Sequence, residues 1–98
     1  MTRLLLVRPE AEQELAAASR WYEGKRARLG DEFLDDAAAA MRVLAQDPER
    51  ERLYYRSFRR VLLRRFPYKI FYQVIGDRVV VFRVLHAKQE HTRGLKSD

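Results

Sequence analysis

Apolar residues follow a helical period through the first part of the chain. A short apolar run at residues 4–7 is followed by Pro9, which suits the first position of a helix because that N–H has no partner there. Beyond it, spacings of four, three and four place four apolar residues on one helical face: Ala11, Leu15, Ala18 and Tyr22. The pattern predicts a short strand at residues 4–7, buried on both faces, and a helix from Pro9 to about Lys25.

A second helical stripe follows a short connection. Gly24 and Gly30 bracket a basic segment, which is typical of a helix end and a turn. Asp31 is expected to be the N-cap of the next helix, and Asp47-Pro48 is expected to end it. The apolar stripe of this helix consists of Phe33, Ala37, Ala40 and Leu44. Two amphipathic helices with so short a connection predict an antiparallel helical hairpin.

β-Branched and aromatic residues dominate from residue 53 onward. Strands are expected around residues 61–63, 68–75 and 78–85, with Gly76-Asp77 as a two-residue hairpin turn. Residues 53–56 are either a further short strand or an extended connection. The predicted fold is α+β, in the order β-α-α-β-β-β, with an antiparallel-dominated sheet and the helical hairpin packed on one face. One domain is expected over residues 1–98, with a tail that frays after about Arg93.

Alternation along the last two strands predicts which side chains face the helices. The set expected to face them is Ile70, Tyr72, Val74, Val80, Phe82 and Val84. The set expected to face away is Lys69, Phe71, Gln73, Val79, Val81 and Arg83. This predicts an open sheet face that bears cations and an exposed aromatic ring, Phe71. The aromatic residues expected in the core are Trp21, Tyr22, Phe33 and Tyr72.

Charge divides the chain into two unlike halves. The net charge is +6, but residues 1–49 carry a net −3 and residues 50–98 a net +9. The second half should therefore attract polyanions or acidic protein surfaces. The absence of cysteine excludes disulfides and thiolate metal sites. With no apolar run long enough for a membrane span and no recognisable signal peptide, we expect a cytoplasmic protein with no membrane partner.

Basic residues on the predicted sheet are candidates for binding a nucleic acid or a protein target. With the aromatic Phe71 they form the set Arg59, Arg60, Arg64, Arg65, Phe71 and Arg83. A solvated face that keeps the sheet soluble is the competing interpretation. His86 lies near Lys88 and Lys69 and could act as an acid or base, or could cap the end of a strand. No phosphate-binding loop or metal-ligand cluster is recognisable, so no cofactor is expected.

Several segments in a fixed order resemble the RelE/ParE toxin superfamily. They are Pro9-Glu10-Ala11-Glu12, Trp21-Tyr22, Leu29-Gly30, Phe33-Leu34, Arg59-Arg60, Phe66-Pro67-Tyr68 with Ile70 and Tyr72, and Val84-Leu85-His86. The resemblance covers residues 4–86. It implies the toxin of a type II toxin–antitoxin pair, with a cognate acidic antitoxin as partner and contact with operator DNA only through that antitoxin.

The superfamily divides by target, and the resemblance leaves the target open. RelE-like members cleave mRNA on the ribosome, and the matching catalytic positions here are Lys69, His86 and Lys88. ParE-like members inhibit DNA gyrase and are not enzymes. Lys88 stands where many relatives have arginine, and no tyrosine follows His86. A ParE-like gyrase inhibitor is therefore favoured over an mRNA endonuclease, and a non-toxic member that only binds its partner is the third alternative.

Overall fold

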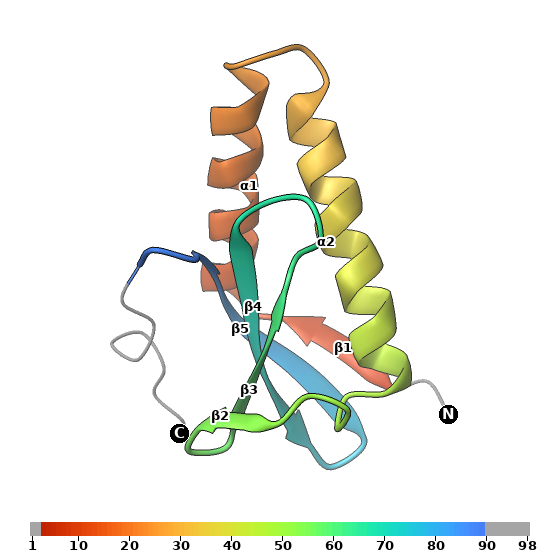
Figure 1. Cartoon of the computed structure of the whole chain (residues 1–98). Helices are drawn as coiled ribbons and strands as arrows, with labels where there is room; N and C mark the ends of the chain where they lie inside the picture. The colour runs from red at the N-terminus through yellow and green to blue at the C-terminus, as the bar shows by residue number, and fades with distance from the viewer. Residues whose placement is uncertain (1–2, 90–98) are drawn as a thin grey trace.

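The computed structural model describes residues 3–89 as two helices and a five-stranded sheet (Figure 1). The elements in chain order are β1 (Leu4–Val7), α1 (Pro9–Glu23), α2 (Leu29–Gln46), β2 (Leu53–Tyr55), β3 (Phe58–Leu62), β4 (Tyr68–Ile75) and β5 (Arg78–His86). The predicted α+β class is confirmed, and residues 53–55 are a strand of their own. The expected fraying after Arg93 lies outside the described residues.

Helix α1 forms where the apolar stripe predicts it. Pro9 occupies the first turn, and Glu10 and Glu12 stand near the positive end of the helix dipole. Ala11, Ala18 and Tyr22 are buried. Trp21 is 58% exposed, so the expectation that it belongs to the core is wrong. It lies one residue from the buried stripe, and that rotation of about 100° turns its ring toward solvent.

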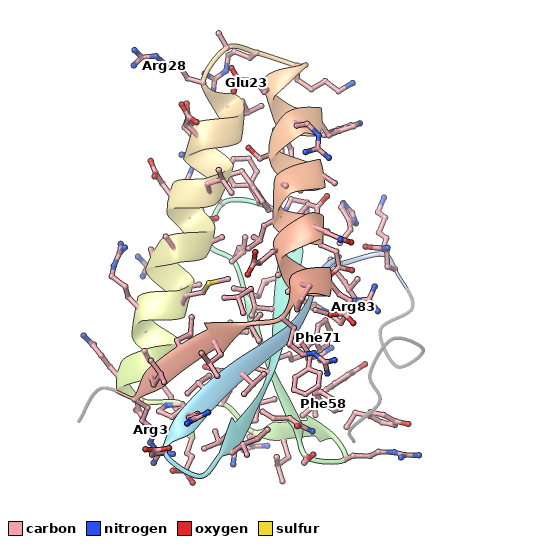
Figure 2. All side chains as sticks on the ribbon, turned by 180° about the vertical axis from the view of Figure 1, so that it is seen from behind. Arg3, Glu23, Arg28, Phe58, Phe71 and Arg83 are labelled. Carbon is pink, nitrogen blue, oxygen red and sulfur yellow. The ribbon has the colours of Figure 1, made fainter. Side chains whose placement is uncertain are left out.

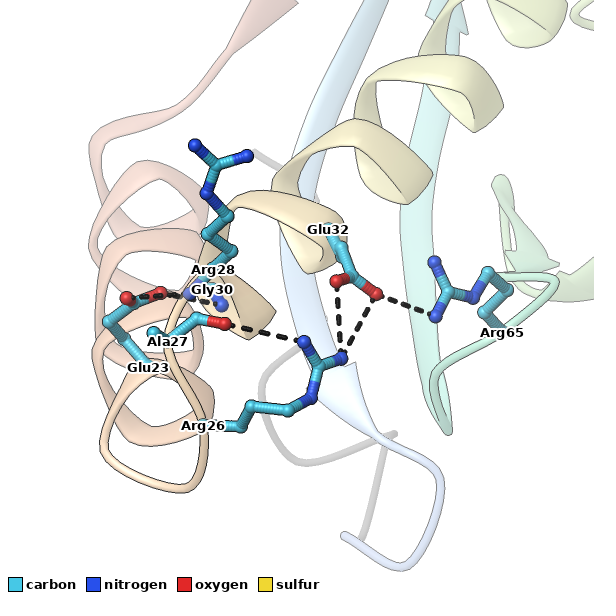
Figure 3. Close-up of polar contacts among 7 residues, drawn as sticks. All are labelled: Glu23, Arg26, Ala27, Arg28, Gly30, Glu32 and Arg65. Atoms are coloured by element: carbon cyan, nitrogen blue, oxygen red, sulfur yellow. Dashed lines mark hydrogen bonds and ion pairs between the residues drawn. The ribbon is translucent and has the colours of Figure 1, made fainter.

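Helix α2 begins two residues before the expected N-cap. Arg28 precedes it in the left-handed backbone region, with φ 72°, and Asp31 lies in the first turn, so the prediction that Asp31 caps the helix is wrong. The carboxylate of Glu23 accepts hydrogen bonds from the N–H groups of Arg28 (2.9 Å) and Gly30 (3.0 Å) (Figure 3). The last residue of α1 therefore satisfies the N-terminus of α2, which fixes the helical hairpin at its loop.

Gly30 allows the two helices to approach closely. A Cβ atom at this position would lie 2.4 Å from the carbonyl oxygen of Ser19 in α1. Ala37 and Phe33 continue the same buried face of α2. The lack of a side chain at Gly30 therefore permits the close contact between the two helix backbones.

The sheet has the strand order β1-β5-β4-β3-β2. β1 pairs with β5 in parallel, and the other neighbouring strands are antiparallel. The predicted β4–β5 hairpin is confirmed, with Ile75 opposite Arg78 and Gly76 at φ 61°. Both helices cover one face of this sheet (Figure 1). Within residues 3–89, neither helix is long and apolar enough to cross a membrane.

A bulge in β5 reverses part of the predicted facing. Phe71 pairs with Arg83 but Tyr72 pairs with Val81, so Phe82 is an extra residue in β5. Val79 and Val81 consequently pack in the helix-side core, whereas Phe82 packs on the opposite face. The predictions that Val79 and Val81 face away, and that Val80 and Phe82 face the helices, are wrong because strict alternation fails at a bulge.

β1 is an edge strand and is only half buried. Leu5 and Val7 pack against the helix-side core, but Leu4 is 57% exposed and Leu6 is 40% exposed. The expectation of a strand buried on both faces is wrong, because its outer face has no covering layer among the described residues. The parallel pairing with β5 nevertheless joins the first strand to the last one.

Candidate functional site

The open face of the sheet carries a second apolar cluster instead of an exposed aromatic ring. Its buried members are Phe58, Phe71, Phe82 and Leu85. Phe71 has no exposed surface, so the prediction of an exposed ring is wrong. Figure 2 shows Phe58 and Phe71 close together at one end of the sheet. This cluster stabilises the sheet, and the Phe71 ring itself offers no surface to a ligand.

Lys69 and His86, two of the three candidate catalytic residues, lie on opposite faces of the sheet. Lys69 pairs with Leu85, which belongs to the open-face cluster. His86 pairs with Tyr68, which packs on the helix-side core, and the two rings are 5.2 Å apart. Directly opposed residues of antiparallel strands share a face. The structure therefore does not bring the Lys69 ammonium group and the His86 imidazole together.

Lys88, the third candidate catalytic residue, meets His86 through its backbone. The Lys88 N–H donates to Nδ1 of His86 at 3.1 Å, and the His86 N–H donates to Oε1 of Gln89 at 2.7 Å. These bonds hold the turn that follows β5. Such an arrangement matches the strand-end cap interpretation of His86.

Three of the candidate arginines are bound to acceptors within the protein. Arg59 donates to the backbone carbonyl of Glu51. Arg65 contacts Glu32 at 2.8 Å (Figure 3). Arg83 pairs with Phe71 on the open face, as predicted, but its guanidinium group reaches Glu14 in α1 at 2.5 Å. These side chains tie elements together, and the charges of Arg65 and Arg83 are partly neutralised.

The Glu32 carboxylate is shared by two arginines at the loop end of the helical hairpin. Hydrogen bonds from Arg65 and Arg26 lower the pKa of Glu32 below its ordinary value. Arg65 also lies above the Phe66 ring, with its guanidinium carbon 5.4 Å from the ring centre. The network joins the start of α2 to the β3–β4 connection (Figure 3).

Arg60 and Arg64 are the candidate arginines that remain available for a ligand. The Arg60 guanidinium carbon lies 3.8 Å from the centre of the Tyr54 ring. Arg64 is exposed and borders a groove between α2 and β3, which also contains Val43 and Leu62. Val43 is 45% exposed and Leu62 is 57% exposed. The groove thus combines apolar surface with charged side chains of both signs, Arg50 and Arg64 together with Asp36 and Glu51.

A second hollow lies between α1 and the ends of β4 and β5. It has a volume of about 580 Å³ and is lined by aromatic side chains, namely Trp21, Tyr22, Tyr68 and His86. The ammonium group of Lys25 lies 4.6 Å from the Trp21 ring centre. Sequence reasoning missed this surface, although the position of Trp21 beside the buried stripe was a usable signal.

Comparison with known proteins identifies the family. A model described as "ParE toxin of type II toxin-antitoxin system, parDE" matches residues 5–91. The search of curated proteins found no match.

Two solved structures share the fold. The chain is similar to a structure of the chromosomal ParDE system from P. aeruginosa, with a TM-score of 0.80, 16% identity, and coverage of 89% of this chain and 98% of that one. It is also similar to a structure of the RelBE2 toxin–antitoxin complex from Mycobacterium tuberculosis, with a TM-score of 0.60, 18% identity, and coverage of 88% and 99%. Because the family match spans most of the sequence, this chain belongs to the ParE toxin family of type II toxin–antitoxin systems.

Proposed function

We propose that this protein is a cytoplasmic toxin that inhibits DNA gyrase and is neutralised by a cognate acidic antitoxin. The family match over residues 5–91 is the observation that carries the proposal. The separation of Lys69 from His86 across the sheet supports a binding mode of action over RNA cleavage, because general acid–base chemistry needs its groups at one reacting centre.

The antitoxin partner is supported by the exposed apolar surface of the α2–β3 groove and by the arginine at its rim. Both solved neighbours come from toxin–antitoxin systems. In this chain the α2–β3 groove exposes Val43 and Leu62 beside Arg64. An amphipathic, acidic antitoxin segment could place apolar side chains in that groove and carboxylates against the arginine. Co-purification of the chain with the product of a neighbouring, co-expressed gene tests this partner; failure to co-purify would reject it.

Supercoiling of relaxed plasmid by purified gyrase tests the target. Inhibition that rises with toxin concentration is expected, and full activity at saturating toxin would reject gyrase as the target. His86→Asn is the matched variant, since Oδ1 of asparagine stands where Nδ1 accepts the Lys88 N–H but the amide cannot move a proton. It should still inhibit gyrase.

Expression of the chain alone separates the remaining alternatives. A halt in DNA synthesis with filamentous cells is expected. A halt in protein synthesis, with mRNA cleavage that His86→Asn and Lys69→Ala abolish, would identify a ribosome-dependent endonuclease instead. Normal growth at strong expression would leave a non-toxic member that only binds its partner.

A further inference from the structure

Arginines gather at the β2–β3 edge of the sheet without carboxylate partners. Six lie between residues 50 and 64, and Glu51 is the only acidic residue among them: Arg50, Arg52, Arg56, Arg59, Arg60 and Arg64. Within residues 3–89, none of these six forms an ion pair. Six others do, namely Arg3, Arg8, Arg26, Arg65, Arg78 and Arg83. Most of the charge at this edge is therefore left for a ligand.

Three of these arginines line one hollow. It has a volume of about 510 Å³ and is formed by Arg50, Glu51, Arg52, Leu53, Tyr54 and Arg60. Local contacts hold it in shape. Arg59 donates to the carbonyl of Glu51, which ties the segment before β2 to β3. The Tyr54 ring supports the Arg60 guanidinium at 3.8 Å.

The chemistry of the hollow fits phosphodiester groups. Guanidinium groups bind phosphate oxygens with two parallel hydrogen bonds, and three arginines line this hollow. Single-stranded RNA is recognised mainly by stacking of its bases on open aromatic rings. Here Arg60 covers one face of the Tyr54 ring, and Phe58 and Phe71 have no exposed surface. The hollow can therefore hold the backbone of a nucleic acid but offers its bases little to stack on.

We propose that the β2–β3 edge binds the phosphate backbone of double-stranded DNA directly, through Arg50, Arg52 and Arg60 and without regard to base sequence. This departs from the expectation that contact with DNA is made only through an antitoxin. It does not depend on gyrase as the target, because the contact is made by this chain alone. The Glu51 carboxylate in the same hollow opposes the contact by repelling phosphate.

Fluorescence anisotropy of a short labelled duplex, titrated with the full-length chain, measures the binding. The test protein is the triple variant Arg50→Ala/Arg52→Ala/Arg60→Ala. The control is Arg20→Ala/Arg28→Ala/Arg42→Ala, which removes the same charge from arginines on and between the helices that form no ion pair with any other described residue. The test variant should lose affinity by about tenfold or more, and the slope of log K against log salt should become shallower by about 3. The control should stay within about twofold to threefold of the wild-type affinity.

Glu51→Gln tests the same hollow by a gain of affinity. Loss of the carboxylate should tighten duplex binding by about twofold to fivefold. Circular dichroism would show whether the triple variant folds. The Glu51→Gln variant removes no apolar contact, so its result remains informative even if the triple variant does not fold. Unchanged binding by Glu51→Gln would place the bound phosphates elsewhere and overturn the proposal.

Three further outcomes would also overturn it. Equal weakening of the test and control variants would mean that net charge alone attracts the duplex. Tighter binding of single-stranded RNA than of duplex DNA would identify an RNA site. Displacement of the duplex by polyglutamate as effectively as by unlabelled duplex would identify a surface for acidic protein segments.

Discussion

The carboxylate of Glu14 in α1 binds both the guanidinium group of Arg83 and the backbone N–H of Val84 in β5. The Arg83 Nε and Nη2 atoms lie 2.8 Å and 2.5 Å from Oε2 of Glu14, and Val84 N lies 2.8 Å from Oε1. Hydrogen bonding to this carboxylate raises the pKa of Arg83. One side chain thus anchors the first helix to the bulge of the last strand.

Glu14→Ala should lower the free energy of unfolding by about 2–3 kcal/mol, because it leaves Arg83 and the Val84 N–H without their acceptor in a partly buried place. Urea denaturation measures the change. Glu12→Ala, at an exposed position of the same helix, should cost no more than about 0.5–1 kcal/mol. A double-mutant cycle with Arg83→Met should return a coupling of about 1–2 kcal/mol. Equal costs for the two alanine variants would contradict the anchoring role.

Gly30→Ala should destabilise the helical hairpin. The new methyl group would start 2.4 Å from the Ser19 carbonyl oxygen, which belongs to helix backbone and cannot move without shifting α1. We expect a loss of about 2–4 kcal/mol and a lower midpoint in thermal unfolding. Gly24→Ala is the matched control, since its backbone is right-handed and its nearest neighbour would lie at 3.4 Å. That variant should be neutral or stabilising by up to about 1 kcal/mol.

Ionisation of Tyr72 should lower the free energy of unfolding at alkaline pH. Burial raises the pKa of its hydroxyl to about 12, and the hydroxyl donates to the Pro48 carbonyl at 2.8 Å. Because the folded-state pKa lies above the unfolded value near 10, this contribution is complete below pH 10 and is lost as the pH rises toward 12. Urea midpoints measured between about pH 9 and 11 should fall less steeply for Tyr72→Phe than for the wild type. Tyr54→Phe, at an exposed ring, should keep the wild-type slope.

Arg28→Gly should raise stability. Arg28 has φ 72°, where a side chain costs about 1 kcal/mol and glycine costs little. Its backbone N–H still donates to Glu23 after the substitution. Thermal unfolding should show a midpoint at or above that of the wild type. Arg42→Gly, in the interior of α2, should instead lower stability by about 1 kcal/mol. The prediction is wrong if both variants lose stability equally.

Hydrophobic periodicity predicted the element order because each stripe has to be buried against another element. The helical face ending at Tyr22, the stop at Pro48 and the turn at Gly76 are all local features, and all were found as expected. The added strand β2 has only three residues and an exposed pattern, so alternation alone could not separate it from an extended connection.

The facing of β5 could not be predicted, because nothing local in the sequence marks Phe82 as an extra residue. The bulge lies beside Val84, whose N–H donates to the Glu14 carboxylate of α1. That contact joins residues far apart in the sequence, so local alternation does not reveal it. The exposure of Phe71 at the candidate site was predicted wrongly for a related reason. Alternation placed Phe71 correctly on the open face, but the packing of Phe58 and Phe82 against it is a long-range property. The sequence showed the charge of the arginines at the β2–β3 edge, but it could not show that they have no carboxylate partner within residues 3–89.

The parallel pairing of β1 with β5 has a consequence for synthesis of the protein. Leu4 pairs with Arg78, so the first strand has to wait for the last one to leave the ribosome before the sheet can form. Contacts so distant along the chain slow folding. The apolar faces of both helices also wait for the later strands, because Tyr22 and Phe33 pack against Phe66 and Tyr68. The sheet therefore cannot acquire its β1 edge until residues 78–81 have been synthesised, long after both helices have been made.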